Sequence, residues 1–421
     1  MNILWVTPIG ARSAIGRFST FVVDELVKLG HDVVVVGSEW KPSPDSHPFV
    51  ARTFHSAASF LEGHQADAFD VIVANFGDHF PNHVGALHFL GHSRMIGIFH
   101  DADMSNFGNG VRAFGADIAP PLPAISFANA TVTGAVARLC AGAVTHSPFY
   151  AHGVDTCDGP VAIIPLAWAI APSSSPTAPS SPEGRVRITT IGNINRNKCA
   201  DRLIEALGLS DSLKGRCDYR LVGAIEDKER EFLTSLAAEK GVSLTILGPV
   251  DDPTLDAEIM SADIISCLRE PVLEGASASA IESMMHGKAV MVSYAGFYLE
   301  LPADCVIRIP AETRPEDICR ALEKVADDPE ERARLAARAK AFALDVFSPK
   351  RYAGDLVALA EEVRALSAYQ PVLSRLAGQL AALGLGPSSP AAGFILDQME
   401  HLIPIERRVM ASDLGNRDGT P

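Results

Sequence analysis

The sequence predicts an α/β protein with two doubly wound parallel sheets, each in a domain of its own. Short apolar runs alternate with helical patterns along most of the chain, which is the pattern of βαβ units and of a parallel sheet. A chain of 421 residues is too long for one ordinary hydrophobic core, and its 47% of apolar residues can fill two. A segment rich in proline and serine, 171–185, separates the two series of strands and is expected to be a linker.

The first domain is expected to span residues 1–170. Its first strand, Asn2–Thr7, leads through a loop with Gly10 and Gly16 into a helix, and a second buried strand, Asp32–Gly37, follows. The glycine spacing does not fit the dinucleotide fingerprint, so a phosphate-facing loop and a plain glycine turn both stay open. Further strands are expected at 71–74, 96–99, 142–145 and 161–164.

The second domain is expected to span residues 186–346. Its strands are predicted at 186–191, 219–222, 242–247, 264–268, 289–292 and 306–309. A helix is expected from about Lys350 to Leu366, followed by a helical extension with a polar tail, 371–421. Because ligands of doubly wound folds bind beyond the carboxyl ends of the strands, the expected site is a cleft between two facing domains.

Composition disfavours several classes of function. The chain has 36 basic and 51 acidic residues, a formal charge of −15 that repels phosphate backbones, so no nucleic-acid partner is expected. The seven cysteines are an odd number without C-x-x-C pairs, which indicates free thiols in a reducing cytoplasm. The amino terminus lacks a basic region with a long apolar run, and no stretch of about 18 apolar residues occurs. We therefore expect a cytoplasmic protein.

The turn after the predicted strand 264–268 is the main candidate site. It contains Glu274, Gly275 and small residues, and a second carboxylate, Glu282, follows eight positions on (282 minus 274) inside a helix that ends near Gly287. The small residues leave backbone N–H groups open to a phosphate, and sugar hydroxyls could bind at either carboxylate.

A second candidate is the loop Gly192–Lys198, between the first strand of the second domain and a helix near Cys199. Its glycine lets the backbone approach a ligand, and cations beside a helix amino terminus suit a diphosphate. A plain polar loop is the alternative. The position of the loop at the same sheet edge as Glu274 favours the ligand.

Histidines and aspartates of the first domain suggest further sites. His100, Asp101 and Asp103 follow the strand 96–99, where His100 could position a sugar or take part in catalysis. A D-x-D metal site, or a structural histidine with an aspartate helix cap, are the alternatives.

Two H-x-x-x-H pairs have a spacing that can bind a transition metal. A glutamate or cysteine ligand does not accompany them, and Pro81 interrupts the first pair, so an exposed helix or an acceptor-facing surface is the preferred interpretation and no metal is expected. The four histidines are His79, His83, His88 and His92.

Together these motifs resemble the signature of retaining GT-B glycosyltransferases of the Glu-x7-Glu type, group 1. Glu274-Gly275 with Ile281-Glu282 carries the two carboxylates, and Gly192 to Lys198 followed by Leu203-Ile204-Glu205-Ala206 resembles the phosphate loop and the helix after it. The resemblance covers the second domain well and the first loosely. It implies the GT-B fold, with two Rossmann-like domains facing a cleft and a helix, 347–370, that crosses back to the first domain.

The resemblance also implies roles for individual residues. Glu274 would hold the donor sugar near the reacting carbon, Glu282 would bind the ribose, and His100 would face the sugar from the first domain. Asn193 and Cys199 stand where the family has arginine and glycine, and Arg196 is the residue expected to compensate. The implied catalytic residues are Glu274, His100 and Lys198, and the implied donor-binding residues are Gly16, Gly192, Arg196, Lys198, Val250, Gly275, Ala278, Ser279 and Glu282.

The implied function is that of a retaining, hexosyltransferase-like glycosyltransferase in polysaccharide or glycoconjugate biosynthesis. It would move a sugar from a UDP or GDP donor to a hydroxyl acceptor, either a glycan, a lipid-linked or a small molecule, without metal or cofactor. Peripheral association with the inner face of the membrane and the oligomeric state stay open. The alternatives are a nucleotide-sugar epimerase or hydrolase on the same fold, a non-catalytic nucleotide-sugar-binding relative, and a two-lobed solute-binding protein, which would need export.

Overall fold

The chain divides into two compact units, one made of Met1–Pro165 with Lys350–Pro421 and the other of Leu166–Pro349. The computed structural model describes residues 1–118, 122, 125–127, 130–170, 185–369, 372, 375–376, 379–380, 382–385, 389 and 410–411. Except for Arg185, the predicted linker lies outside the described residues, and so does most of the predicted extension 371–421.

The first unit is built on a parallel sheet with the strand order β14-β7-β6-β5-β4-β1-β2-β3. The order reverses between β1 and β4, so the loops after these strands flank a topological switch point. The short strand β3 pairs with β2 and was not predicted, because three partly exposed residues give little hydrophobic signal. The strands are β1 (Asn2–Thr7), β2 (Asp32–Gly37), β3 (Arg52–Phe54), β4 (Val71–Phe76), β5 (Met95–Phe99), β6 (Gly142–Thr145), β7 (Val161–Ile163) and β14 (Met410–Ala411).

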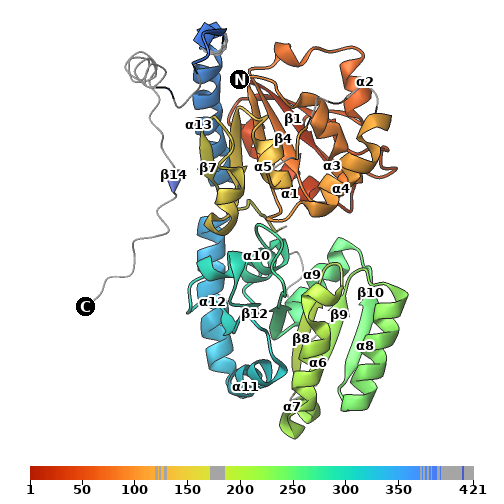
Figure 1. Cartoon of the computed structure of the whole chain (residues 1–421). Helices are drawn as coiled ribbons and strands as arrows, with labels where there is room; N and C mark the ends of the chain where they lie inside the picture. Colours follow the sequence, from red (N-terminus) through yellow and green to blue (C-terminus); the bar gives the residue numbers. More distant parts are fainter. Residues whose placement is uncertain are drawn as a thin grey trace, which may run out of the picture. The chain divides into compact units, whose positions relative to one another are not determined.

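Helix α1 of the first unit shows how its sequence fixes both ends and one face. Ser13 caps the amino terminus by accepting from the Gly16 N–H, and the buried residues Phe18, Val22 and Leu26 recur every four positions. The Phe18 ring also meets the Tyr352 ring of α13 edge-on at 5.1 Å between centroids. Helices α1 and α13 belong to the same unit (Figure 1). The helices are α1 (Ala14–Lys28), α2 (Ala57–Leu61), α3 (Phe80–His83), α4 (Ser105–Phe114), α5 (Val132–Ala137) and α13 (Pro349–Ser367).

The second unit has a parallel sheet with the strand order β10-β9-β8-β11-β12-β13. Its order reverses between β8 and β11, so the switch point lies at the carboxyl ends of these two strands. The strands are β8 (Val186–Ile191), β9 (Cys217–Val222), β10 (Leu244–Gly248), β11 (Ile264–Cys267), β12 (Ala289–Ser293) and β13 (Ile307–Ile309).

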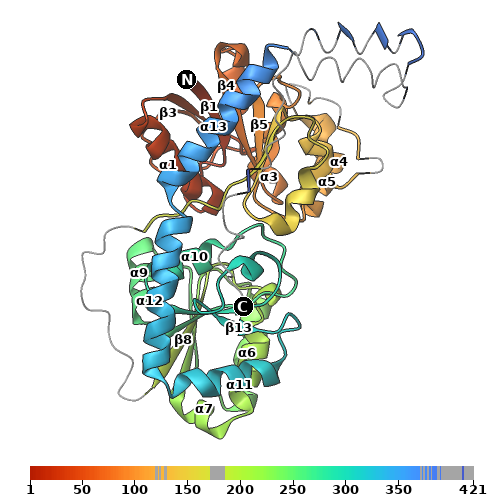
Figure 2. The same ribbon diagram turned by 90° about the vertical axis from the view of Figure 1, so that its left-hand side faces the viewer.

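Helices cover both faces of this second sheet. Helix α6 packs against α8 and α11, while α10 packs against α12, and Figure 2 shows the sheet between these groups. The helices are α6 (Ala200–Gly208), α7 (Asp211–Arg216), α8 (Asp227–Lys240), α9 (Asp252–Ser261), α10 (Ala278–Met285), α11 (Pro315–Ala326) and α12 (Pro329–Val346).

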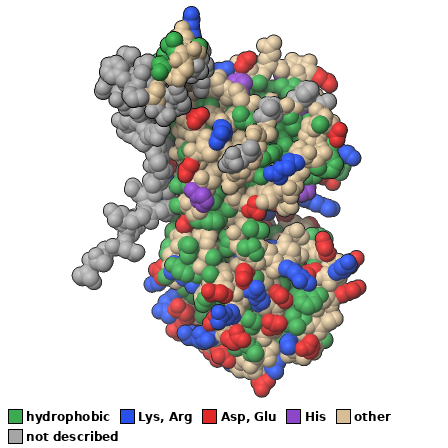
Figure 3. Space-filling view, in the orientation of Figure 1, with side chains coloured by type: hydrophobic (Ala, Val, Ile, Leu, Met, Phe, Trp, Pro, Cys, Tyr) green, Lys and Arg blue, Asp and Glu red, His purple; other side chains and the backbone are tan. Residues whose placement is uncertain are grey.

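The two units have separate hydrophobic cores. One core cluster is drawn from residues between Val186 and Leu335, and the other from residues between Leu4 and Cys157. All seven cysteines are buried free thiols, as predicted. On the face of the second unit shown in Figure 3, basic and acidic side chains are interspersed rather than gathered by sign. In the described part of the chain, a helix that is both long and apolar enough to span a membrane does not occur.

Candidate functional site

Two loops of the second unit meet at its switch point. The loop after β8 contains Gly192 and Lys198, and the loop after β11 contains Arg269 and Glu274. Hydrogen bonds join them directly, because the Glu270 N–H donates to the Asn197 carbonyl at 3.0 Å and the Asn197 side-chain amide donates to the Pro271 carbonyl. The two loops therefore lie side by side at the switch point.

Glycines let the β8 loop fold tightly. Gly192 has φ of 92°, and a Cβ there would lie 3.0 Å from the Lys198 Nζ. At the end of β9, Gly223 has φ of 139°, and a Cβ there would lie 2.0 Å from the Gly192 carbonyl oxygen. Both positions need glycine, because a side chain would meet strain and a neighbour at once.

Lys198 is a buried cation held inside this loop. Its Nζ donates to the Ile191 carbonyl at 2.5 Å, and its residue surface is 8% exposed. Burial, and to a smaller extent the nearby Arg269 charge, lower the pKa of Lys198 to about 7, while Cys267 and Glu274 oppose the shift. The amine therefore gives up its proton much more readily than an exposed lysine does.

Glu274 is held by two residues to which the sequence analysis assigned no role. Arg269 Nε donates to Glu274 Oε1 at 2.8 Å, and the Tyr298 hydroxyl donates to the same oxygen at 3.2 Å. Burial raises the pKa of Tyr298 well above its usual range, so this hydroxyl stays protonated. The signal for Arg269 was its position directly after a buried strand at the edge that carries Lys198. Tyr298 lies in a short turn after β12 and gave no such signal.

The turn after Glu274 leads into α10 through Gly275 and the cap residue Ser277. Ser277 Oγ accepts from the Ala280 N–H at 3.4 Å, so Ala278 and Ser279 are the first residues of the helix. Amides in the first turn of a helix have no acceptor within the helix, and they suit an anion. Ser279 Oγ also receives a 3.4 Å bond from Arg269 Nη2.

Glu282 lies inside α10 and is 4% exposed. It groups with Asp256 of α9 and His286, with one ligand atom of each within 4.8 Å of the others, and His286 Nε2 lies 3.7 Å from Asp256 Oδ1. Two carboxylates and an imidazole are a donor set for a divalent metal. Among the described residues this is the group that could hold a metal ion.

Arg196, the other cation of the β8 loop, does not lie beside Lys198. Its side chain is 81% exposed, its Nε is 3.7 Å from Glu229, and its guanidinium lies over the Phe232 ring at 5.6 Å. It therefore contacts α8 rather than Lys198. Val250, between β10 and α9, is half-buried.

In the first unit, His100 belongs to a buried polar chain at the end of β5. Its Nε2 lies 3.0 Å from Asn75 Oδ1, and its Nδ1 lies 3.1 Å from Nε2 of His146, whose Nδ1 donates to the Ile164 carbonyl at 3.0 Å. Burial holds the pKa of His100 well below its usual range, with the charge of His146 as a smaller cause. His100 is thus a neutral hydrogen-bonding group at neutral pH.

The glycine loop of the first unit already holds a side-chain carboxyl group. The N–H groups of Ile9 and Gly10 donate to Glu39 Oε1 at 2.6 and 2.7 Å, and burial raises the pKa of this carboxyl. The Gly16 N–H donates to Ser13 Oγ at 3.1 Å, and a Cβ on Gly16 would lie 2.6 Å from the Pro8 carbonyl oxygen. The contacts of Gly16 are therefore those of close helix packing.

The other polar candidates of the first unit make local contacts. Asp101 accepts from the Asp78 N–H at 2.8 Å, and Asp103 accepts from the Ser105 N–H at 3.0 Å beside the start of α4. The prediction that the histidine pairs lie on an exposed surface is wrong for His83, which is 2% exposed. Its Nδ1 lies 2.9 Å from the Asn75 carbonyl oxygen. His92 contacts Asp67 instead, at 2.8 Å.

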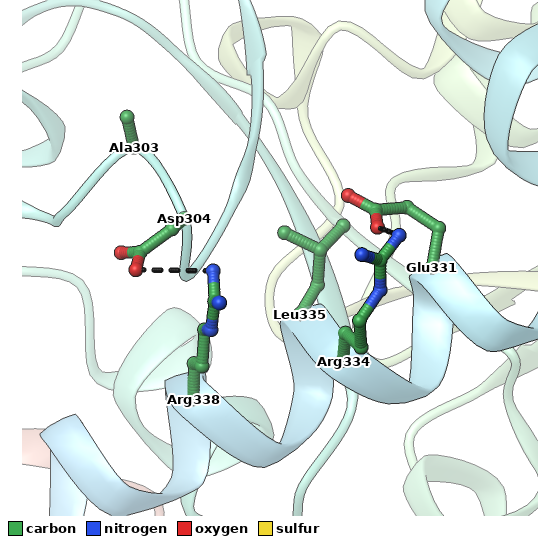
Figure 4. Close-up of a pocket in the computed structure, with 6 residues that line it drawn as sticks. All are labelled: Ala303, Asp304, Glu331, Arg334, Leu335 and Arg338. Carbon is green, nitrogen blue, oxygen red and sulfur yellow. Dashed lines mark hydrogen bonds and ion pairs between the residues drawn. The ribbon is translucent and has the colours of Figure 1, made fainter.

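A surface pocket of the second unit lies away from the switch-point loops. Figure 4 shows Arg338 joined to Asp304 at 3.2 Å, and Arg334 paired with Glu331 on α12. Its charges are balanced within the pocket wall, which gives it no net attraction for an anionic ligand. Ala303 and Leu335 complete the lining.

Comparison with known protein families gives a match in the second unit, which contains the switch-point loops. Residues 175–342 match the family model described as Glycosyl transferases group 1. No curated protein matches the sequence.

Solved structures resemble the chain over most of its length. Sucrose-phosphate synthase from Thermosynechococcus elongatus has a TM-score of 0.64 at 16% identity, covering 87% of this chain and 100% of that chain. Anabaena HepE, in complex with UDP and glucose, has a TM-score of 0.56 at 15% identity, covering 85% and 98%. WaaG, a glycosyltransferase involved in lipopolysaccharide biosynthesis, has a TM-score of 0.56 at 16% identity, covering 84% and 98%.

Identities this low establish the fold and not the activity. The chain therefore has the GT-B fold that the sequence predicted, and its residues 175–342 match the glycosyl transferases group 1 family.

Proposed function

We propose that the protein is a retaining glycosyltransferase that moves a sugar from a nucleoside diphosphate donor to a hydroxyl acceptor. The observation that carries the proposal is the group formed by the buried Lys198 and Arg269 and the half-buried Glu274 at the switch point of the second sheet. A buried cation beside open helix amides suits a diphosphate, and a fixed carboxylate suits sugar hydroxyls. The family match of residues 175–342 and the UDP complex of a protein with the same fold support this assignment.

In the proposed reaction the bond from the anomeric carbon to the diphosphate oxygen breaks, and a bond to the acceptor oxygen forms on the same face. The acceptor proton leaves with the nucleoside diphosphate, so the atoms balance. Lys198 and the amides of Ala278 and Ser279 would stabilise the charge that develops on the leaving diphosphate. Positioning and this charge stabilisation supply the catalysis.

The remaining residues would orient the donor. Both contacts of Glu274 use Oε1, and we assign Oε2 to a sugar hydroxyl. Glu282 would bind the ribose, Val250 would line the base, and Gly192 and Gly275 would let the backbone approach the donor. His100, neutral and hydrogen-bonded, is proposed to meet the sugar from the first unit.

The first prediction tests this site. Lys198→Ala and Glu274→Ala should each lower turnover of UDP- or GDP-sugars by about 100-fold or more, because each removes a charged side chain that is proposed to stabilise the transition state. Product formation is measured by chromatography over a panel of hydroxyl acceptors, and proton NMR of the product reports whether the anomeric configuration is retained.

Arg220→Gln is the matched control, because Arg220 and Glu258 form a partly buried ion pair at 2.7 Å in the same unit. It should leave turnover unchanged. Wild-type turnover in Lys198→Ala or Glu274→Ala would overturn the site assignment. Product formed from the donor alone would instead indicate an epimerase or hydrolase, and donor binding without turnover a non-catalytic relative.

A further inference from the structure

We propose that Arg269 is the positioning residue of this site, which fixes the Glu274 carboxylate and supplies the second positive charge beside Lys198. The meaning of this inference rests on the proposed function, because it assumes that Lys198 meets the donor diphosphate. The contacts and charges that support the inference are present in the protein without a ligand, so they can be tested separately from the proposed function.

The guanidinium of Arg269 is held from three sides. Its Nε donates to Glu274 Oε1 at 2.8 Å, its Nη1 to the Leu268 carbonyl at 2.8 Å, and its Nη2 to Ser279 Oγ at 3.4 Å. The residue is 6% exposed. A planar guanidinium can make these contacts together, whereas an ammonium group at a single point cannot. Arg269 therefore ties the end of β11, Glu274 and the first turn of α10 into one arrangement.

The second cation of the β8 loop, Arg196, contacts α8 rather than Lys198. Asn193 stands where the family resemblance calls for an arginine, and Arg196, the expected substitute, contacts Glu229 and Phe232 instead. Arg269 is the cation whose charge acts on Lys198. The missing charge thus comes from the loop after β11, on the other side of the switch point.

Arg269 and Lys198 also repel one another. Burial and three neighbouring groups set the pKa of the Lys198 amine: burial and Arg269 lower it to about 7, while Cys267 and Glu274 oppose the shift. A bound diphosphate favours the protonated amine, so binding takes up a proton when the pH is near or above 7. Donor affinity should then fall as the pH rises above 7, by up to about tenfold per pH unit.

The second prediction separates the two roles of Arg269. Arg269→Gln removes the positive charge, so the pKa of Lys198 should rise, whereas Arg269→Lys keeps the charge and should leave that pKa near its wild-type value. The Lys198 amine is followed by NMR in ligand-free protein carrying labelled lysine, and its signal is assigned by its loss in Lys198→Met. A merely structural role of Arg269 would leave this titration unmoved.

Turnover and UDP or GDP affinity give the second readout. In Arg269→Gln the fall of nucleotide affinity should move to higher pH, and kcat should fall by about 100-fold because Glu274 is no longer held. Arg269→Lys should recover the pH profile of binding but only part of kcat. The control Arg220→Gln removes an arginine from an ion pair of the same unit and should change neither the Lys198 titration nor the nucleotide affinity.

The inference is overturned if Lys198 titrates at the same pH in wild type and Arg269→Gln, or if Arg269→Lys turns over at the wild-type rate. Should Arg269→Gln fail to fold, Arg269→Lys provides the test. Its kcat should be lower than that of wild type, while its nucleotide affinity is unchanged. If wild-type protein binds neither UDP nor GDP, the proposed function fails, while the NMR titration still decides whether Arg269 acts on Lys198.

Discussion

His83 and His146 are buried imidazoles. The ring of His83 contacts the carbonyl of Asn75, and the ring of His146 contacts the carbonyl of Ile164 and the ring of His100. Burial lowers the pKa of each to about 4. In the unfolded chain both histidines take up a proton near pH 6.5, whereas in the folded protein they do so only near pH 4. The folded state therefore binds fewer protons over this range.

The third prediction follows from that difference at the residue scale. The free energy of unfolding should be at its full value above pH 6.5 and fall as the pH drops towards 4, by about 3 kcal/mol for each histidine. Urea unfolding at several pH values measures it. His83→Phe should flatten the dependence, while the exposed His152→Gln should not. A profile that stays level from pH 6.5 to 4 would contradict the prediction.

At the scale of elements, the ends of β8 and β9 are joined by the contact of two glycines. Because a Cβ on Gly223 would lie 2.0 Å from the Gly192 carbonyl oxygen, the loop that holds Lys198 depends on the residue after the neighbouring strand. The fourth prediction is that Gly223→Ala lowers the free energy of unfolding by about 2–4 kcal/mol and weakens UDP binding.

Gly215→Ala is the control for this change. Gly215 lies in α7 with nothing within 4 Å of an added Cβ, so alanine should stabilise the helix by about 0.5–1 kcal/mol. Thermal and urea unfolding, with calorimetry of UDP binding, measure both variants. If Gly223→Ala is as stable as wild type, the glycine contact does not shape the loop.

How much of the site the sequence could predict depends on distance along the chain. Lys198 and Glu274 each follow a predicted strand of one parallel sheet, and the carboxyl ends of such strands share an edge. Tyr298 reaches Glu274 from a turn 24 residues further on, and Glu39 reaches Gly10 from 29 residues away. Such contacts depend on side-chain directions in the folded protein, which periodicity does not reveal. For the same reason the sequence did not reveal that the Arg196 side chain lies on the surface, against α8.

At the scale of the whole molecule, the sequence predicted the buried strands but not the short edge strand β3. Runs such as Val33–Val36 are apolar at every position, because both faces of a parallel sheet are covered. The edge strand β3 has only three residues, and none is fully buried. The order β10-β9-β8-β11-β12-β13, which the sequence did not predict, places the switch point at the ends of β8 and β11.

The fifth prediction concerns metal. We expect EDTA to leave UDP affinity and turnover unchanged, because Lys198 and Arg269 provide the positive charge although the whole chain carries a formal charge of −15. Calorimetry and assays with EDTA, then with Mn²⁺ restored, measure it. Activity lost with EDTA and recovered with Mn²⁺ would contradict the prediction and point to Asp256, Glu282 and His286, where Asp256→Asn should prevent the recovery.

The hydrogen bonds from the Ile9 and Gly10 amides to the Glu39 side chain have a consequence for any free anion that reaches this loop. A group tethered by its own chain competes at a high effective concentration, so a free anion arriving at these amides must displace a permanent competitor. An uncharged hydroxyl compound meets no such competition, since it needs neither amide. The glycine loop of the first unit is in this way closed to a free anion unless the Glu39 side chain is first displaced.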